Sequence, residues 1–271
     1  KFMKKKYKII WFIIKYSIEK FFLKNFEMYA PSVAGSSKTK GKITIDNINR
    51  IFPMISTLIS NLGFRKKIIN SKSFCISKKK LQEANKLKNL FNKHGSDKSS
   101  VHDYHYIYSS IFKNPTKIKN ILEVGIGTND ISMLSNMGGT SRPGASLRTF
   151  RDYFKKSMVY GADIDKKILF KDTRIVTRYV DQTDPKSISK LFKYFGCKFD
   201  LIIDDGLHSH ITNLNLIINS MKFLKKNGCL VIEDISLSSR AIWETISAIV
   251  GVKYKCFLIK CNKSYIFLIY N

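Results

Sequence analysis

Acidic side chains follow two apolar runs of this chain, where strands of a parallel sheet would end. The residues concerned are Asp204, Asp205 and His208 after one run, and Glu233 and Asp234 after the other. Carboxylates held this close together raise one another's pKa values, and a divalent cation removes that repulsion. Hard oxygen ligands suit Mg²⁺. The pattern therefore predicts a magnesium site where the two strands meet at one rim.

A glycine turn and further acids predict a nucleoside site beside it. The run from Asn120 ends in Gly125 and Gly127 and carries one acid, Glu123, which could face a cationic ligand group. Three more positions lie at the ends of the next two apolar runs: Asp163, Asp181 and Gln182. An acid ending the second strand can accept hydrogen bonds from both ribose hydroxyls, and the third strand end can reach an adenine edge. The alternative role for each acid is to cap the N-terminus of the next helix, and either Asp163 or Asp165 could be the cap before Lys166.

These residues need a sheet to hold them, and apolar runs alternate with helical stretches from Lys119 onward. The expected strands are 121–124, 158–164, 175–180, 201–203 and 229–232, and the expected helices are 145–153, 166–170, 185–194, 212–224 and 238–250. The runs 253–259 and 264–270 predict a closing antiparallel hairpin. We expect an α/β fold with a doubly wound, mostly parallel, seven-stranded, Rossmann-like sheet.

The N-terminal part has a different pattern. We expect residues 1–95 to form a basic, mainly helical extension and residues 96–271 the α/β domain. Within the extension, Lys1 to Lys24 predicts a basic helix, 28–42 a linker, 43–69 one or two short helices and 77–91 a helix. The segment Asn92 to Phe112 is rich in His, Tyr, Asp and Ser, and either crosses the ligand or is an ordinary surface loop.

The formal net charge of the 271 residues is +28, which can indicate nucleic acid or an anionic membrane surface as a partner. A compositional bias toward lysine explains the charge equally well. The first helix either contacts a membrane peripherally or packs on the domain. The five cysteines form no CxxC pair, so we expect neither zinc nor disulfides and a reducing, cytoplasmic location, with membrane association and a homo-oligomer left open.

Five segments of the chain resemble class I S-adenosylmethionine-dependent methyltransferases of the macrocin and mycinamicin sugar O-methyltransferase family. In chain order they are GASLRTFRDYF, VYGADID, VDQTD, FDLIIDDGLHSH and GCLVIEDI. The resemblance covers roughly Phe91 to Ile235, and HGSDKSSVHDYHYIY resembles that family's preceding segment. The insertion between Thr128 and Pro143 departs from the family pattern.

The resemblance implies a function and roles for particular residues. It implies S-adenosylmethionine and Mg²⁺ as cofactors and a sugar-containing small molecule as methyl acceptor. Asp205, Glu233 and Asp234 would be the metal ligands. The cofactor-binding residues would be Glu123, Gly125, Gly127, Ser146, Asp163, Asp181, Gln182 and Asp204, the last of which could instead orient its loop.

His208 would be the general base. Metal coordination lowers the pKa of a sugar hydroxyl, and imidazole can take its proton at neutral pH. The alternative for His208 is a surface histidine capping the next helix, a role that suits His210 better. A cluster of Tyr104, His105 and Tyr106 could line the acceptor pocket, and Arg148 and Arg151 could pair with Asp152.

Three other functions stay open on the sequence. The charge favours an RNA methyltransferase, although DDGLH stands where amino-methylating enzymes of that kind have an NPPY-like tetrad. A relative with changed chemistry, as in cephalosporin-hydroxylase-like proteins, is the second. A non-enzymatic membrane-surface protein that uses the first helix is the third.

Overall fold

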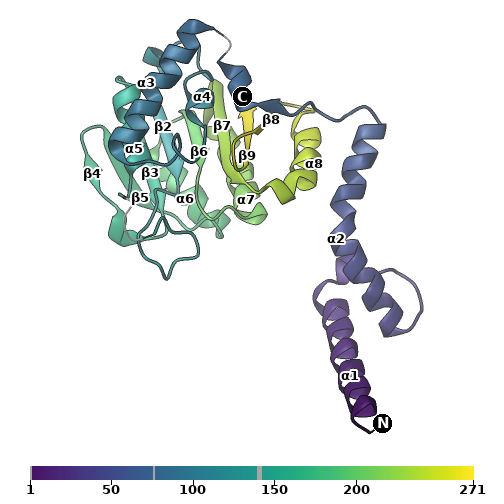
Figure 1. Cartoon of the computed structure of the whole chain (residues 1–271). Coiled ribbons are helices and arrows are strands. Elements are labelled where there is room, and N and C mark those ends of the chain that lie inside the picture. The colour runs from purple at the N-terminus through teal and green to yellow at the C-terminus, as the bar shows by residue number, and fades with distance from the viewer. Residues whose placement is uncertain (1, 76, 139–141) are drawn as a thin grey trace. The chain divides into compact units, whose positions relative to one another are not determined.

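The computed structural model describes residues 2–75, 77–138 and 142–271, and the chain divides into two compact units, Lys1–Arg65 and Lys66–Asn271 (Figure 1). The boundary lies earlier than the predicted one at residue 95. The reason is that helix α3 (Lys78–His94) packs Leu87 and Phe91 into the core of the second unit.

The first unit contains two helices, α1 (Phe2–Asn25) and α2 (Ser37–Asn61), with the 3₁₀ turn η1 (Glu27–Tyr29) between them. The predicted linker ends early because Ser36 caps α2, its hydroxyl accepting a hydrogen bond from the Thr39 amide at 3.3 Å. Of residues 43–69, predicted to form one or two short helices, 43–61 belong to one continuous helix that includes Pro53, and the chain leaves the helix after Asn61. None of the helices in the described residues is long and apolar enough to cross a bilayer.

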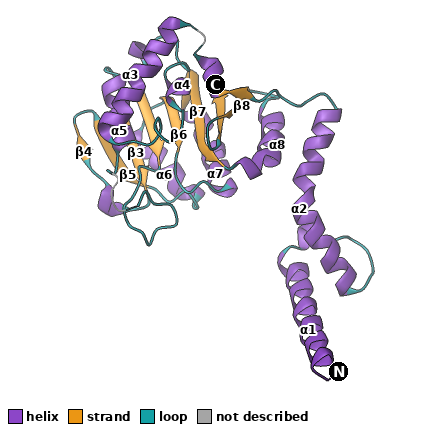
Figure 2. Cartoon of the chain, in the orientation of Figure 1, coloured by secondary structure: helices purple, strands orange, loops and turns teal. Residues whose placement is uncertain are grey.

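The second unit is built on a sheet, drawn in orange in Figure 2. Among the described residues it has nine strands in the order β1-β8-β9-β7-β6-β2-β3-β5-β4. The strands are β1 (Ile69–Asn70), β2 (Asn120–Val124), β3 (Met158–Asp163), β4 (Lys171–Asp172), β5 (Ile175–Tyr179), β6 (Phe199–Asp204), β7 (Leu224–Ile235), β8 (Lys255–Lys260) and β9 (Tyr265–Tyr270). Strands β5, β3, β2, β6 and β7 are parallel, and β9 runs antiparallel between β7 and β8. This confirms the predicted parallel sheet with a closing antiparallel hairpin. The two-residue strands β1 and β4 extend its edges.

Helices cover both faces of the sheet (Figure 2). Side chains of α3, α4 (His105–Tyr108) and α5 (Ala145–Tyr153) pack against one face, and those of α6 (Pro185–Phe195), α7 (His210–Ser220) and α8 (Arg240–Val250) against the other. Successive strand residues alternate between the faces, as Ile121 and Leu122 do. The remaining 3₁₀ turns are η2 (Ser71–Phe74), η3 (Pro115–Lys117), η4 (Lys166–Ile168), η5 (Met221–Phe223) and η6 (Leu237–Ser239).

One predicted helix is wrong. Residues 166–170 form only the 3₁₀ turn η4, capped by Asp165, whose carboxylate accepts a hydrogen bond from the Lys167 amide at 2.9 Å. The chain then turns into β4, where Lys171 and Asp172 pair with Val176 and Ile175 of β5. A segment this short cannot bury a helical face, so the antiparallel pairing with β5 decides its conformation.

Candidate functional site

A cavity of about 530 Å³ opens beyond the carboxyl ends of the central parallel strands. Its walls include these predicted site residues: Gly125, Gly127, Ser146, Asp163, Asp181, Gln182, Asp205, His208 and Asp234. Gly95 to Lys98 also line it, so the polar segment before the first core strand contributes to the cavity. The volume falls within the range of small-molecule sites, and the position is the one at which open α/β sheets bind ligands.

The turn after β2 requires glycine at two positions. Gly125 and Gly127 have φ angles of +86° and +79°, which side chains with a Cβ rarely adopt. A Cβ at Gly125 would overlap the Asp205 carbonyl oxygen, and one at Gly127 would overlap the Met137 side chain. The turn therefore lets backbone approach the cavity closely.

Asp163 sits at the end of β3, where both of its carboxylate oxygens accept hydrogen bonds from backbone. Oδ2 accepts from the Ile126 amide at 2.8 Å and Oδ1 from the Asp165 amide at 2.9 Å. Burial raises the pKa of Asp163, and these bonds oppose the shift. Each oxygen keeps a lone pair, so the side chain can accept hydroxyl donors from the cavity. The N-cap role belongs to its neighbour Asp165.

The two residues after β5 differ in their freedom. The Asp181 carboxylate accepts hydrogen bonds from the Thr183 amide at 2.8 Å and the Thr183 hydroxyl at 2.7 Å, all through one oxygen. Both polar atoms of the Gln182 side chain have a partner, because Oε1 accepts from the Leu207 amide at 3.1 Å and Nε2 donates to Asp204 at 2.7 Å. Gln182 thus holds the loop after β6 in place, and Oδ2 of Asp181 has no hydrogen-bond donor among the described residues.

Asp204 lies under the site and does not line the cavity. Strand alternation places it on the α7 face of the sheet, completely buried, where Asn213 donates to its Oδ2 at 3.0 Å and Gln182 to its Oδ1. Burial raises the pKa of Asp204, while the two amide donors oppose that shift. Its contacts match the loop-orienting alternative of the two that the sequence left open.

Lys98 supplies a buried cation among the predicted acids. Its Nζ lies 2.5 Å from Asp205 Oδ2 and 3.3 Å from Glu123 Oε1, and it also pairs with Glu233. Burial alone would lower the pKa of Lys98, but the charges of the three acids raise it well above its ordinary value. The ammonium therefore stays charged and neutralises part of the cluster.

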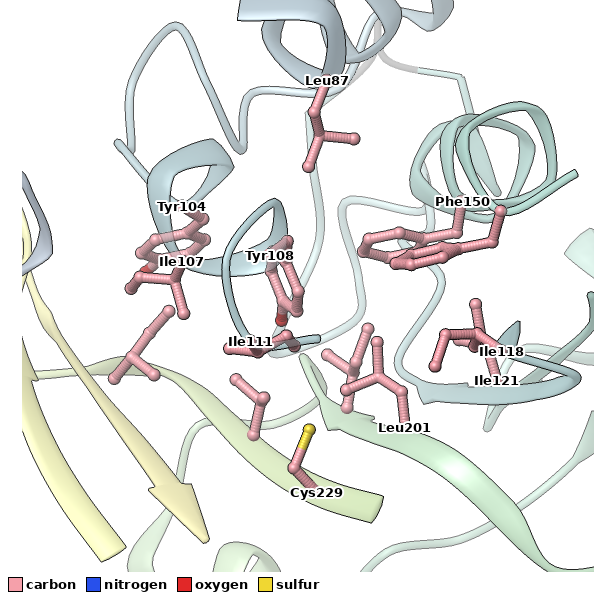
Figure 3. Close-up of a cluster of buried hydrophobic side chains, with 14 of the residues drawn as sticks. Leu87, Tyr104, Ile107, Tyr108, Ile111, Ile118, Ile121, Phe150, Leu201 and Cys229 are labelled. Carbon is pink, nitrogen blue, oxygen red and sulfur yellow. The ribbon is translucent and has the colours of Figure 1, made fainter. Parts of the chain in front are cut away.

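Glu123 and Glu233 lie on the same face of the sheet as Lys98 and are fully buried. Glu123 accepts a hydrogen bond from the Ser146 hydroxyl at 2.6 Å, and burial raises the pKa of Glu123 to about 7. Glu233 accepts from the Tyr108 hydroxyl, and burial likewise raises its pKa. Figure 3 shows Tyr108 among the apolar side chains over the sheet, with its hydroxyl directed toward the strands. Neither acid is part of the cavity wall.

Asp205, His208 and Asp234 form the group in the described residues that could share one metal ion. Each offers a ligand atom, and these atoms lie within 4.8 Å of one another. His208 Nε2 lies 3.9 Å from Asp205 Oδ1 and 3.9 Å from Asp234 Oδ2. His208 and Asp234 have φ angles of +54° and +52°. Residues other than glycine rarely adopt this conformation, and such strained residues cluster at functional sites.

Asp234 is held from behind by the segment that precedes the sheet. The Tyr104 hydroxyl donates to its carboxylate, and His102 Nδ1 lies 3.3 Å from Oδ1. Burial would raise the pKa of Asp234, but the hydrogen bond from Tyr104 and the nearby His102 and His208 lower it overall. Asp234 is therefore kept as a carboxylate facing the cavity.

Two of the three predicted metal ligands thus lie together, and the third is turned toward Lys98 and Tyr108. The structure adds three residues to the site that the sequence analysis gave no role: Lys98, His102 and Tyr108. All three come from 92–112, the segment for which the sequence left open a place across the ligand or an ordinary surface loop, so its composition was the available signal. Of the predicted Tyr104, His105 and Tyr106 cluster, Tyr104 contacts Asp234, and the rings of His105 and Tyr106 lie tilted against each other with centroids 4.1 Å apart.

The two arginines of α5 and the insertion after β2 were also singled out on the sequence. Arg151 pairs with Asp152 at 2.8 Å, as expected, and with Asp172 at 3.1 Å. Arg148 stacks over Phe170, 4.5 Å from the ring centroid. The insertion between Thr128 and Pro143 contributes Ser132 to Met137 to the cavity wall, while residues 139–141 lie outside the described residues.

The sequence resembles named sugar O-methyltransferases. It is 31% identical over 153 residues to the 8-demethyl-8-alpha-L-rhamnosyl tetracenomycin-C 2'-O-methyltransferase of Streptomyces olivaceus, covering 56% of this chain and 38% of that protein. It is 33% identical over 121 residues to the demethylmacrocin O-methyltransferase of Streptomyces fradiae, covering 42% and 27%. The chain therefore spans under two fifths of the length of these relatives. No family model matches the chain.

Solved structures show the same fold. The MycE methyltransferase from the mycinamycin biosynthetic pathway, in complex with Mg, SAH and mycinamycin VI, aligns with a TM-score of 0.54 at 19% identity, covering 68% of this chain and 53% of that one. The resemblance seen in the motifs is confirmed: the chain has the class I methyltransferase fold and is similar to the macrocin and mycinamicin sugar O-methyltransferases.

Proposed function

We propose that this chain, a class I methyltransferase fold similar to the sugar O-methyltransferases, transfers the methyl group of S-adenosylmethionine to a hydroxyl of a sugar or glycosylated metabolite. The observation that carries the proposal is the placement of His208, with its Nε2 3.9 Å from both Asp205 and Asp234, at the wall of the glycine-turn cavity. A nucleoside pocket and a base beside two carboxylates then meet in one cavity.

The cavity suits S-adenosylmethionine in the chemistry of its walls. The glycine turn leaves room for the cofactor backbone, and Asp163 offers oxygens to the two ribose hydroxyls. Asp181 has a free oxygen for the adenine amino group, while Gln182 and Asp204 hold the loop that carries Asp205. Ser146 lines the cavity and orients Glu123. The sulfonium is already activated, so positioning is the main requirement on the protein.

A divalent cation fits beside it at Asp205 and Asp234, whose carboxylates face the cavity and share their neighbourhood with His208. Such a cation supplies a Lewis acid that lowers the pKa of an acceptor hydroxyl. Oxygen ligands suit Mg²⁺, which leaves the imidazole free for proton transfer. Glu233 is the weaker candidate ligand, because Lys98 and Tyr108 already engage its oxygens.

His208 takes the hydroxyl proton as the acceptor oxygen bonds to the methyl carbon and the carbon–sulfur bond breaks, which releases S-adenosylhomocysteine. Asp205 and Asp234 flank its imidazole and stabilise the imidazolium that forms. The acceptor would lie on the side of the cavity formed by Gly95 to Lys98 and the residues from Ser132 to Met137. These two segments lie outside the strands and helices of the α/β core, and they would therefore select the acceptor.

Calorimetry of S-adenosylmethionine binding to the full chain tests the proposal, with and without Mg²⁺, on the wild type and on Asp205→Ala. We expect binding by both proteins and a Mg²⁺ dependence only in the wild type. A methyl-transfer assay on a panel of glycosides, with a chelator as the second arm, then tests the chemistry. A folded wild-type protein that binds no cofactor would exclude the methyltransferase, and activity indifferent to chelator would exclude the metal alone.

A further inference from the structure

Helix α1 presents an exposed apolar run that nothing in the proposed reaction uses. Ile9 to Ile14 are six consecutive apolar residues, and each is between 45% and 63% exposed. At 3.6 residues per turn, six residues cover every side of a helix. The run is therefore apolar all round, which in a water-exposed helix indicates a binding partner.

The neighbouring helix covers only one side of this run. The α1 and α2 backbones approach closely at Gly41, where a Cβ would lie 2.6 Å from the Glu19 Cβ, and Glu19 is 3% exposed. On the side that faces α2, Trp11, Ile14 and Ile18 line a groove of about 300 Å³. Within the described part of this unit, each side chain of the run keeps at least 45% of its surface exposed beside α2.

The charge around the run selects the kind of partner. Lys8 precedes it directly and Lys15 follows it, and residues 1–65 contain thirteen lysines and arginines against three acids. This excess disfavours a second copy of the same face, because like charges repel. Nucleic acid would use the lysines and could stack bases on Trp11 and Phe12, but the four isoleucines of the run add nothing to phosphate contacts or base stacking.

We propose that Ile9 to Ile14 insert into the surface of an anionic lipid bilayer, with Lys8 and Lys15 among the headgroups. A helix in this position lies in the plane of the bilayer, with its apolar side chains buried to a depth of about 5–10 Å, and the six residues extend about 9 Å along the membrane surface. Lysine side chains can extend along apolar surface and keep their ammonium groups in the headgroup region. Trp11 suits the boundary between headgroups and acyl chains.

Trp11 is a direct reporter of this insertion in the full chain. The protein has two tryptophans, and Trp243 is 1% exposed in the core while Trp11 is 63% exposed. Trp11→Phe gives the Trp243 background for subtraction. Vesicles of phosphatidylcholine with phosphatidylserine should shift Trp11 emission to shorter wavelength and co-sediment with the protein. Vesicles of phosphatidylcholine alone should do so much less.

Two paired variants separate the apolar from the charged contribution. Ile10→Ser with Ile13→Ser should abolish the emission shift. Lys8→Glu with Lys15→Glu keeps the apolar run and should weaken binding at least about tenfold, because each lysine near an anionic surface contributes about 1 kcal/mol. The control, Ile211→Ser with Ile218→Ser, alters residues of α7 that are 71% and 72% exposed and should bind like the wild type.

The proposal fails if Trp11 emission ignores anionic vesicles, or if binding survives both paired variants. It also fails if Ile10→Ser with Ile13→Ser abolishes a concentration-dependent self-association seen without lipid, because the run would then be an interface between copies. Binding to single-stranded RNA that displaces the vesicles, with no emission shift on the vesicles themselves, would assign the basic unit to nucleic acid and overturn the proposal.

Discussion

The ammonium nitrogen of Lys98 lies 2.5 Å from Oδ2 of Asp205, although 107 residues separate them along the chain. The contact ties the segment before the sheet to the loop after β6. The same ammonium reaches the buried Glu233 and Glu123, so one lysine counters acids from three strand ends. Its position makes Lys98 a determinant of both the stability and the electrostatics of the site.

Lys98→Met should destabilise the protein strongly. Removing one member of a buried ionic cluster leaves uncompensated charge and costs about 3–5 kcal/mol. Urea denaturation at neutral pH measures the change. The matched control is Lys86→Met, whose exposed ion pair with Glu83 in α3 should be worth no more than about 1 kcal/mol. Equal effects of the two substitutions would contradict a buried role for Lys98.

Mg²⁺ should stabilise Lys98→Met more than it stabilises the wild type. Without the ammonium, Asp205 and Glu233 can both turn their oxygens to a cation, and a ligand that binds only the folded state raises its stability. The thermal midpoint with and without Mg²⁺, in each protein, measures this difference. An identical shift in both proteins would show that the lysine and the cation do not compete for the same acids.

Gly125→Ala should weaken cofactor binding and lower stability. The backbone at Gly125 has a φ of +86°, and a Cβ there would overlap the Asp205 carbonyl oxygen and Gly206 Cα. The left-handed conformation alone costs an alanine about 1–2 kcal/mol, and the overlap would displace the loop that carries Asp205. Binding of S-adenosylhomocysteine and the thermal midpoint are the readouts. Gly35→Ala, where a Cβ meets nothing within 4 Å, should leave both unchanged.

The unfolding free energy should fall between about pH 6.5 and pH 4 because of His105. Burial, with a smaller contribution from Lys88, lowers its pKa from 6.5 to about 4. The unfolded chain binds the proton first as pH decreases, so the stabilisation is complete above pH 6.5 and is lost as pH falls toward 4. His105→Gln should flatten this part of a denaturation series across pH. A slope unchanged by the substitution would assign it to other groups.

The positions of the strand-end residues could be predicted because the sequence signal of a buried strand lies within the strand itself and the few residues that follow it. An apolar run followed by acids indicates a buried strand and its carboxyl end, and β2, β3, β5 and β6 lie where the pattern placed them. The hairpin of β8 and β9 followed from two runs separated by a short turn. In contrast, β1 and β4 have two residues each and leave no periodic signal.

The direction and partner of each acid could not be predicted, because they depend on contacts distant in sequence. Asp204 and Glu123 end neighbouring strands, yet one points to the α7 side and the other to Lys98. The alternation of a strand separates its two faces but does not say which helix covers which face. Lys98 lies in a polar loop, and nothing in its local sequence distinguishes it from the other lysines of this basic chain.

His208→Asn should lower methyl transfer by about 10²–10⁴-fold, the usual contribution of a general base, while cofactor binding is retained. Asparagine tolerates the left-handed backbone that His208 adopts at φ +54°, so the substitution tests the imidazole without straining the loop. The rate should stay low when Mg²⁺ is raised to saturation, because the lost group accepts a proton and does not hold the metal.

The control for this prediction is His210→Asn, at the first position of α7. His210 lies in the same loop-to-helix segment, but it is absent from the cavity wall and from the group around Asp205 and Asp234 in the described residues. It should retain nearly full activity. Recovery of His208→Asn at high Mg²⁺ would instead make His208 a metal ligand, since its Nε2 lies equally far, 3.9 Å, from the two carboxylates. The pH–rate profile separates the two outcomes: loss of a base removes the limb on the acidic side, whereas loss of a ligand shifts only the Mg²⁺ dependence.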